Sequence, residues 1–123
     1  MKARIYPIWH KGKKIYFTDW TNLSDTDTAI NVVEETTRFI EQNNEYDLLE
    51  LLDVRGSYAS AKVLLKLKEA AERTKNFSRK KAIVGITGSK KILLMGVNRF
   101  IYGSIKGFED IDKAKEWLTA ENN

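Results

Sequence analysis

The sequence of 123 residues contains no cysteine, one proline and one histidine. Without cysteine, the chain has no disulfide, no thiolate metal ligand and no cysteine nucleophile. His10 has neither a second histidine nor an acidic cluster beside it, so we expect no metal site. The chain also lacks any apolar run near the roughly 20 residues that span a bilayer, and its amino terminus lacks the apolar part of a secretory signal. These absences predict a cytoplasmic protein.

Sequence motifs that are typical of common enzyme classes are absent as well. The chain has no GxSxG, HExxH or GxGxxG pattern. The spacing of Gly85 and Gly88 and the residues after Lys91 do not match a phosphate-binding loop of the nucleotide hydrolases. We therefore expect no catalytic activity and no cofactor, and an enzyme with an unfamiliar site ranks third among our interpretations.

What is present is an uneven distribution of charge behind a net charge of +4. Eight acids and one base lie between Asp25 and Glu50, whereas ten bases and two acids lie between Lys62 and Lys91. The basic part is compatible with an anionic partner, and two solvated helix faces of opposite charge are the simpler explanation. Nucleic-acid binding is not expected, because the aromatic residues are separated in sequence from most of the bases.

Hydrophobic periodicity divides the chain into alternating strands and helices. Residues 4–9 and 14–19 predict a hairpin, and the leucine-rich segment 46–54 predicts a strand covered on both faces. Ser24 is the expected N-cap of the first helix, and Asp110 that of the last. The remaining expectations are helices over 24–42, 60–75, 89–102 and from 110 onward, and strands over 81–87 and 104–108.

This order, ββαβαβαβα, predicts an α/β fold. Strands joined by helices are parallel through right-handed crossovers, and the hairpin adds one antiparallel strand. The expected architecture is therefore a small mixed, mainly parallel sheet with flanking helices. Because no Pro-, Gly- or Ser-rich stretch interrupts the chain, we expect one domain over residues 1–123.

Ligands of open α/β sheets meet the chain beyond the carboxyl ends of the strands, which directs attention to two loops. The first loop, residues 53–60, gathers chemically active side chains beside a helix start, and it could hold an anion or a modifiable serine. In the alternative, Ser57 or Ser60 caps the helix while Asp53 and Arg55 satisfy turn amides and each other. The candidate residues here are Asp53, Arg55, Ser57, Tyr58 and Ser60.

The second loop, residues 87–91, places two lysines in the first turn of a predicted helix, where they oppose the helix dipole. Solvent, a carboxylate or a bound anion would offset them, so anion attraction and solvated lysines both stay open. If the two loops meet at one sheet edge, they form a locally positive crevice. The candidate ligand-binding residues in this loop are Gly88, Ser89, Lys90 and Lys91.

Three segments resemble a known family. They are residues 81–100, Lys106-Gly-Phe-Glu-Asp and Ala114-Lys-Glu-Trp-Leu. They look like the carboxy-terminal half of small bacterial STAS proteins, a domain shared by sulphate transporters and anti-sigma-factor antagonists. The resemblance implies a STAS-like fold without a catalytic role of its own, similar to largely uncharacterised antagonist-like proteins.

The resemblance also implies a position for phosphorylation. In the phosphorylatable antagonists a kinase modifies a serine at the helix start after a central strand, which corresponds here to Ser57 or Ser60. Those proteins carry Asp-Ser-Ser/Thr-Gly at this site, and the present chain instead reads Gly-Ser-Tyr-Ala-Ser from Gly56 to Ser60.

The leading hypothesis is therefore a non-catalytic regulatory or binding module. It would engage a protein partner or a small anionic ligand at residues 53–60 together with 87–91. The alternative is a peripheral binder of anionic lipid surfaces that uses the basic region 62–91 and the apolar predicted third helix. The same apolar helix is the basis for expecting a second chain, in a homodimer, or a ligand against it.

Overall fold

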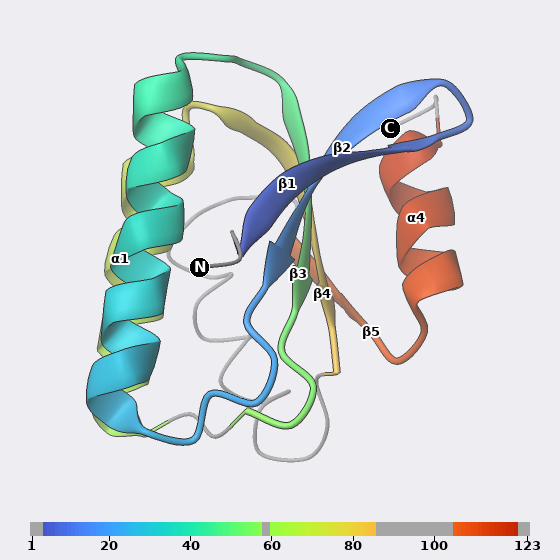
Figure 1. Ribbon diagram of the computed structural model, residues 1–123. Coiled ribbons are helices and arrows are strands. Elements are labelled where there is room, and N and C mark those ends of the chain that lie inside the picture. Colours follow the sequence, from blue (N-terminus) through green and yellow to red (C-terminus); the bar gives the residue numbers. More distant parts are fainter. Residues whose placement is uncertain (1–3, 58–59, 86–104, 121–123) are drawn as a thin grey trace.

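The computed structural model describes residues 4–57, 60–85 and 105–120, and Figure 1 shows the arrangement of their helices and strands. The predicted helix over residues 89–102 lies outside the described residues, as do five candidate residues, Tyr58, Gly88, Ser89, Lys90 and Lys91. The elements are β1 (Ile5–His10), β2 (Lys13–Asp19), α1 (Thr26–Asn43), β3 (Leu48–Asp53), α2 (Ala61–Thr74), β4 (Ser78–Val84), β5 (Ile105–Phe108) and α4 (Ile111–Thr119).

The five strands form one sheet in the order β1-β2-β3-β4-β5. β1 is antiparallel to β2, and every other neighbouring pair is parallel. Each strand thus lies beside its sequence neighbour, and α1 joins β2 to β3 and α2 joins β3 to β4, as expected for parallel strands connected by helices. The predicted mixed, mainly parallel sheet is confirmed, with the leucine-rich β3 at its centre.

Local sequence explains how the elements begin and end. The β1–β2 hairpin turns through Lys11 and Gly12, whose φ angles of 51° and 76° suit the tight turn that matches strand twist. The N-cap of α1 is Asp25. The prediction of Ser24 was wrong, because the helix begins one residue later than expected. The Asp25 carboxylate accepts the Thr28 amide hydrogen bond at 2.9 Å, and its charge suits the helix N-terminus.

Helices cover the two faces of the sheet differently, as Figure 1 shows with α1 and α4 on opposite sides. On one face α4 approaches β3, β4 and β5 closely, whereas α1 and α2 make their main helix contact with each other. The core under α4 consists of fully buried side chains, namely Ile15, Leu51, Ala82, Val84, Ala114 and Leu118. No helix within the described ranges is both long and apolar enough to cross a membrane.

Candidate functional site

The loop after β3 is held together by its own charged pair. The Arg55 guanidinium donates to both carboxylate oxygens of Asp53, with Nε to Oδ1 at 2.9 Å and an Nη to Oδ2 at 2.7 Å. The Arg55 amide also donates to Asp53 Oδ1 at 3.1 Å. Asp53 and Arg55 therefore satisfy a turn amide and each other, which is the structural alternative stated for this loop. The Asp53 side chain is buried beneath the more exposed arginine.

The two serines of this loop also have structural partners. The Ser57 hydroxyl donates to the Trp20 carbonyl and accepts the Leu23 amide hydrogen bond at 2.8 Å. It thereby ties the loop to the connection between β2 and α1. Ser60 is the N-cap of α2, where its hydroxyl accepts from the Val63 amide at 3.3 Å. Modification of either serine would have to break these contacts, and phosphorylation stays a prediction.

The strands that precede the two predicted loops end side by side. β3 and β4 are parallel neighbours, and Asp53 pairs with Val84 at their carboxyl ends. Just beyond β4, Gly85 lies against Arg55 so closely that a Cβ added there would stand 2.6 Å from Arg55 Cγ. The chain thus leaves both strands at one sheet edge. Whether Arg55, Ser57 and Ser60 share a crevice with residues 87–91 stays a prediction, since the latter lie outside the described residues.

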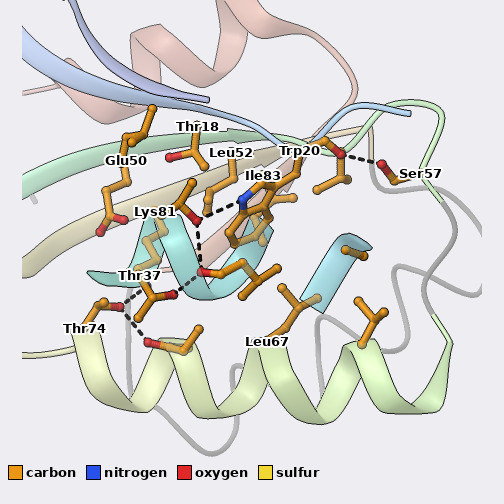
Figure 2. Close-up of a pocket in the computed structure, with 18 of the residues that line it drawn as sticks. Thr18, Trp20, Thr37, Glu50, Leu52, Ser57, Leu67, Thr74, Lys81 and Ile83 are labelled. Carbon is orange, nitrogen blue, oxygen red and sulfur yellow. Dashed lines mark hydrogen bonds between the residues drawn. The ribbon is translucent and has the colours of Figure 1, made fainter. Parts of the chain in front are cut away.

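Between the sheet and the pair α1 and α2 lies a cavity of about 130 Å³. Its floor is formed by strand residues and its walls by the inner faces of the two helices (Figure 2). Most lining side chains are aliphatic, and they include Val33, Ile40, Leu52, Val63, Leu67, Ala70, Ala71 and Ile83. Val54 and Ser57 extend the lining to the first predicted loop. The cavity therefore joins that loop to the apolar interior beneath α1 and α2.

Most hydroxyl and indole groups around the cavity are already hydrogen-bonded within the protein. Thr37 donates to the Val33 carbonyl at 2.6 Å, and Thr74 donates to the Ala70 carbonyl at 3.0 Å. The Trp20 indole donates to the Thr36 hydroxyl at 3.1 Å. Groups that already have hydrogen-bond partners contribute little to binding a ligand, so their part of the lining behaves as an apolar surface.

Two charged residues of the sheet also face this cavity. Glu50 and Lys81 are register partners on β3 and β4, and both line the cavity. The Glu50 carboxylate accepts a hydrogen bond from the Ser78 hydroxyl, and the Lys81 ammonium donates to the Thr74 hydroxyl at 2.7 Å. In Figure 2, Glu50, Lys81 and Thr74 lie toward one end of the cavity, and Trp20 and Ser57 lie toward the other. The cavity is therefore apolar with one polar end.

Outside the cavity, acidic residues of α1 form ion pairs with basic residues of α2. The Glu34 carboxylate of α1 accepts hydrogen bonds from Arg73 at 2.7 Å and from Lys66 of α2, and Arg73 also donates to Glu41 at 2.7 Å. Hydrogen bonds from Arg73 and Lys66 hold the pKa of Glu34 well below its ordinary range, and those from Arg73 lower the pKa of Glu41. The opposite charges thus face each other across the α1–α2 seam rather than lying on two separate solvated faces.

Sequence reasoning missed the cavity, although one signal for it is present. The pattern Leu-Leu-Glu-Leu-Leu-Asp in a strand predicted to be covered on both faces puts the charge of Glu50 inside. A buried charge needs a partner or a polar recess, so this glutamate alone marked the face as unusual.

Comparison with known proteins shows the fold. A solved structure from Shewanella loihica PV-4, an uncharacterised protein of the DUF3478 family with a SpoIIAA-like fold, aligns with a TM-score of 0.70 at 18% identity. The alignment covers 93% of this chain and 91% of that chain. The fold is therefore SpoIIAA-like, which confirms the STAS-like architecture that the sequence resemblance implied. No protein-family model and no curated protein sequence matches the chain.

Proposed function

We propose that this protein is a non-catalytic binding module that holds a small, largely apolar molecule between its sheet and the helices α1 and α2. The observation that carries this proposal is the cavity of about 130 Å³ with its aliphatic lining. Ligand sites are usually concave and mostly apolar, with a few polar groups that orient the ligand. The recess beneath α1 and α2 has this composition, with its polar groups at Glu50 and Lys81.

The energy of an empty cavity supports the proposal. Protein interiors are close-packed, and an unfilled cavity costs about 24 cal/mol per Å³ in a well-studied core. An empty, enclosed cavity of 130 Å³ would cost about 3 kcal/mol, and a recess that holds water costs less but still lacks packing contacts along its aliphatic lining. A ligand that fills the space regains these contacts, so the protein gains stability from occupancy.

The size of the cavity sets the size of the ligand. An engineered apolar cavity of about 150 Å³ in another protein binds benzene. A cavity of about 130 Å³ therefore suits a ligand with the bulk of a single aromatic ring or a short branched chain. Such a ligand is much smaller than a phospholipid.

The absence of catalysis is part of the proposal and is supported by three hydroxyls that line the cavity. The hydroxyls of Ser57, Thr37 and Thr74 each donate to a backbone carbonyl, so none is aligned with a side-chain base that would activate it as a nucleophile. The surroundings of these hydroxyls favour retention of a ligand over its chemical conversion.

The predictions from sequence bear on this proposal in different ways. The loop 53–60 borders the cavity through Val54 and Ser57. The affinity of a protein partner that binds this loop could therefore depend on whether the cavity is occupied. For the alternative, an anionic lipid surface, the basic region 62–91 has less charge to offer, because Lys66 and Arg73 are engaged with carboxylates of α1. We therefore base the function on the cavity rather than on charge.

Calorimetry with toluene tests the proposal. Ligands that bind only the folded state raise its stability, so toluene-saturated buffer should raise the melting temperature of the wild type. The variant Ala71→Leu, which extends an α2 side chain into the cavity, should lose this increase. Leu65→Ala is the matched control, because Leu65 lies on the same helix with 67% of its surface exposed, and it should keep the increase.

Two calorimetric results would contradict the proposal. One is an unchanged melting temperature of the wild type in toluene. The other is an equal increase in Ala71→Leu, which would place binding elsewhere. An experimental structure in which residues 86–104 fill the cavity would also overturn it.

A further inference from the structure

The polar end of the cavity contains a carboxylate with fewer hydrogen bonds than its burial calls for. Glu50 is 3% exposed and lies among leucines in the middle of β3. Within the described residues, its carboxylate has one hydrogen-bond donor, the Ser78 hydroxyl, although an ionised carboxylate can accept about four hydrogen bonds. Buried charged groups are stable only when they are well hydrogen-bonded or paired. Glu50 therefore has free acceptor capacity inside the cavity.

Lys81 gives the same end of the cavity unused donors. It is the register partner of Glu50 on the neighbouring strand, and its ammonium group donates to Thr74. An ammonium group carries three donors, so two of them remain for other partners. Among the residues that the structure describes, Glu50 and Lys81 form no ion pair with each other. The cavity end thus presents an acceptor and a donor whose charges sum to zero.

We propose that the ligand carries a neutral polar group that both donates and accepts a hydrogen bond, a hydroxyl or a primary amide, bound between Glu50 and Lys81. This inference rests on the proposed function. The group donates to the Glu50 carboxylate and accepts from the Lys81 ammonium, while the apolar body of the ligand fills the recess formed by Leu52, Leu67 and Ile83.

Electrostatics explains why the group is neutral. A carboxylate on the ligand would be repelled by Glu50, and an ammonium group would be repelled by Lys81. Either ion would also lose its hydration on entering a largely apolar cavity, and one opposite charge nearby does not compensate when the like charge is equally close. A hydroxyl or amide loses less hydration and can satisfy both protein groups.

Water is the competitor that the ligand must displace. A polar recess of this size can hold ordered water bound to Glu50 and Lys81. A ligand hydroxyl reproduces the hydrogen bonds of such a water, so its displacement is not penalised, and the attached apolar body adds contacts that water lacks. An apolar ligand without the hydroxyl fills the same recess but leaves both charged groups with fewer partners.

Five probes that share one benzene ring test this inference. Titration calorimetry would compare benzyl alcohol, toluene, benzoate and benzylammonium on the wild-type chain. Benzyl alcohol should bind about tenfold more tightly than either ion and several-fold more tightly than toluene. Benzamide, as the amide analogue, should bind comparably to benzyl alcohol.

Variants at the two charged residues should change this preference in opposite directions. Glu50→Gln leaves Lys81 as the one charge of the pair, so benzoate should gain at least tenfold relative to benzyl alcohol. Lys81→Met leaves Glu50, so benzylammonium should gain instead. Toluene binding should persist in both variants, which shows that they fold and keep the cavity. Glu72→Gln removes a carboxylate from the solvent side of α2, where Glu72 pairs with Lys75, and it should leave the preference unchanged.

The outcomes separate this inference from the proposed function. Equal affinities for benzyl alcohol and toluene, or tightest binding of benzoate to the wild type, would overturn the inference and leave the binding module intact. The same holds if Glu50→Gln and Glu72→Gln shift the preference equally. Failure of every probe, toluene included, to bind the folded wild type would overturn both.

Discussion

The two faces of the sheet are packed differently. Beneath α4, alanines at positions 82 and 114 let the helix approach the strands, and the surrounding aliphatic side chains are fully buried. Beneath α1 and α2, the floor contains Glu50, Lys81 and Thr18, and a cavity remains between helices and sheet. Close packing favours stability, whereas a cavity lowers stability and provides space for a ligand. This contrast is the basis for the proposal that the face beneath α1 and α2 binds a ligand.

Truncation of a core leucine should have the largest effect, and the effect should depend on the face. Leu118→Ala removes a side chain that is 1% exposed beneath α4, and it should lower the free energy of unfolding by about 4 kcal/mol. Leu52→Ala borders the existing cavity, so fewer packing contacts are lost, and we expect about 2 kcal/mol. Urea denaturation measures both. Equal losses would remove the proposed difference between the faces.

Enlargement of an alanine should sharpen the comparison, because the same change has opposite signs on the two faces. Ala114→Leu overpacks the contact between α4 and the strands and should destabilise the protein by about 2 kcal/mol. Ala71→Leu extends into the cavity and should stabilise the protein by about 0.5–1 kcal/mol. Both positions are helical, so helix propensity changes equally. Destabilisation by both substitutions to a similar degree would show that the cavity is not available space.

Low pH should lower the stability of the protein by weakening the ion pairs of the α1–α2 seam. Hydrogen bonds lower the pKa of Glu34 and Glu41 in the folded state, so the unfolded chain binds more protons as the pH falls. This contribution to stability is present above the ordinary glutamate pKa of 4.5 and is lost as the pH decreases below it. Glu34→Gln should cost about 1 kcal/mol at pH 7 and weaken the dependence of stability on pH between about 5 and 3.

The control for this prediction lies on the surface of the same helix. Glu35→Gln changes a carboxylate for which no seam contact is present among the described residues, so it should keep the wild-type acid profile. If Glu34→Gln keeps the full acid sensitivity of the wild type, the seam contributes little and the two helices are held in another way.

Much of the fold could be predicted because it follows from local periodicity. The two-faced apolar pattern of β3 placed it at the centre of the sheet, and Asp110 was identified as the cap of α4. Errors arose where local signals compete. Ser24 and Asp25 are adjacent residues that can both cap a helix, and the structure uses Asp25. The strand β4 begins at Ser78 and not at Lys81, because Ser78 pairs with Leu48 before the apolar run of β4 starts.

The candidate site could be predicted only in part, because its decisive features are tertiary. Ser57 is bonded to the Trp20 carbonyl and the Leu23 amide, which are more than 30 positions away in the chain. No local pattern reveals such partners. The cavity depends on how far α1 and α2 stand from the sheet, which the sequence does not state directly. Glu50 was visible within its leucine-rich strand, yet only the fold shows that it faces a recess beside Lys81.

The most direct test of the account is to locate a bound apolar molecule by nuclear magnetic resonance. With methyl groups labelled, titration with toluene should shift the signals of Val33, Val63 and Leu67, which line the cavity, and saturate at one molecule per chain. The signals of Ile15, Val84 and Leu118 beneath α4 should stay nearly constant. Shifts confined to the α4 face, or no saturable shifts at all, would contradict the claim that the face beneath α1 and α2 is the binding face.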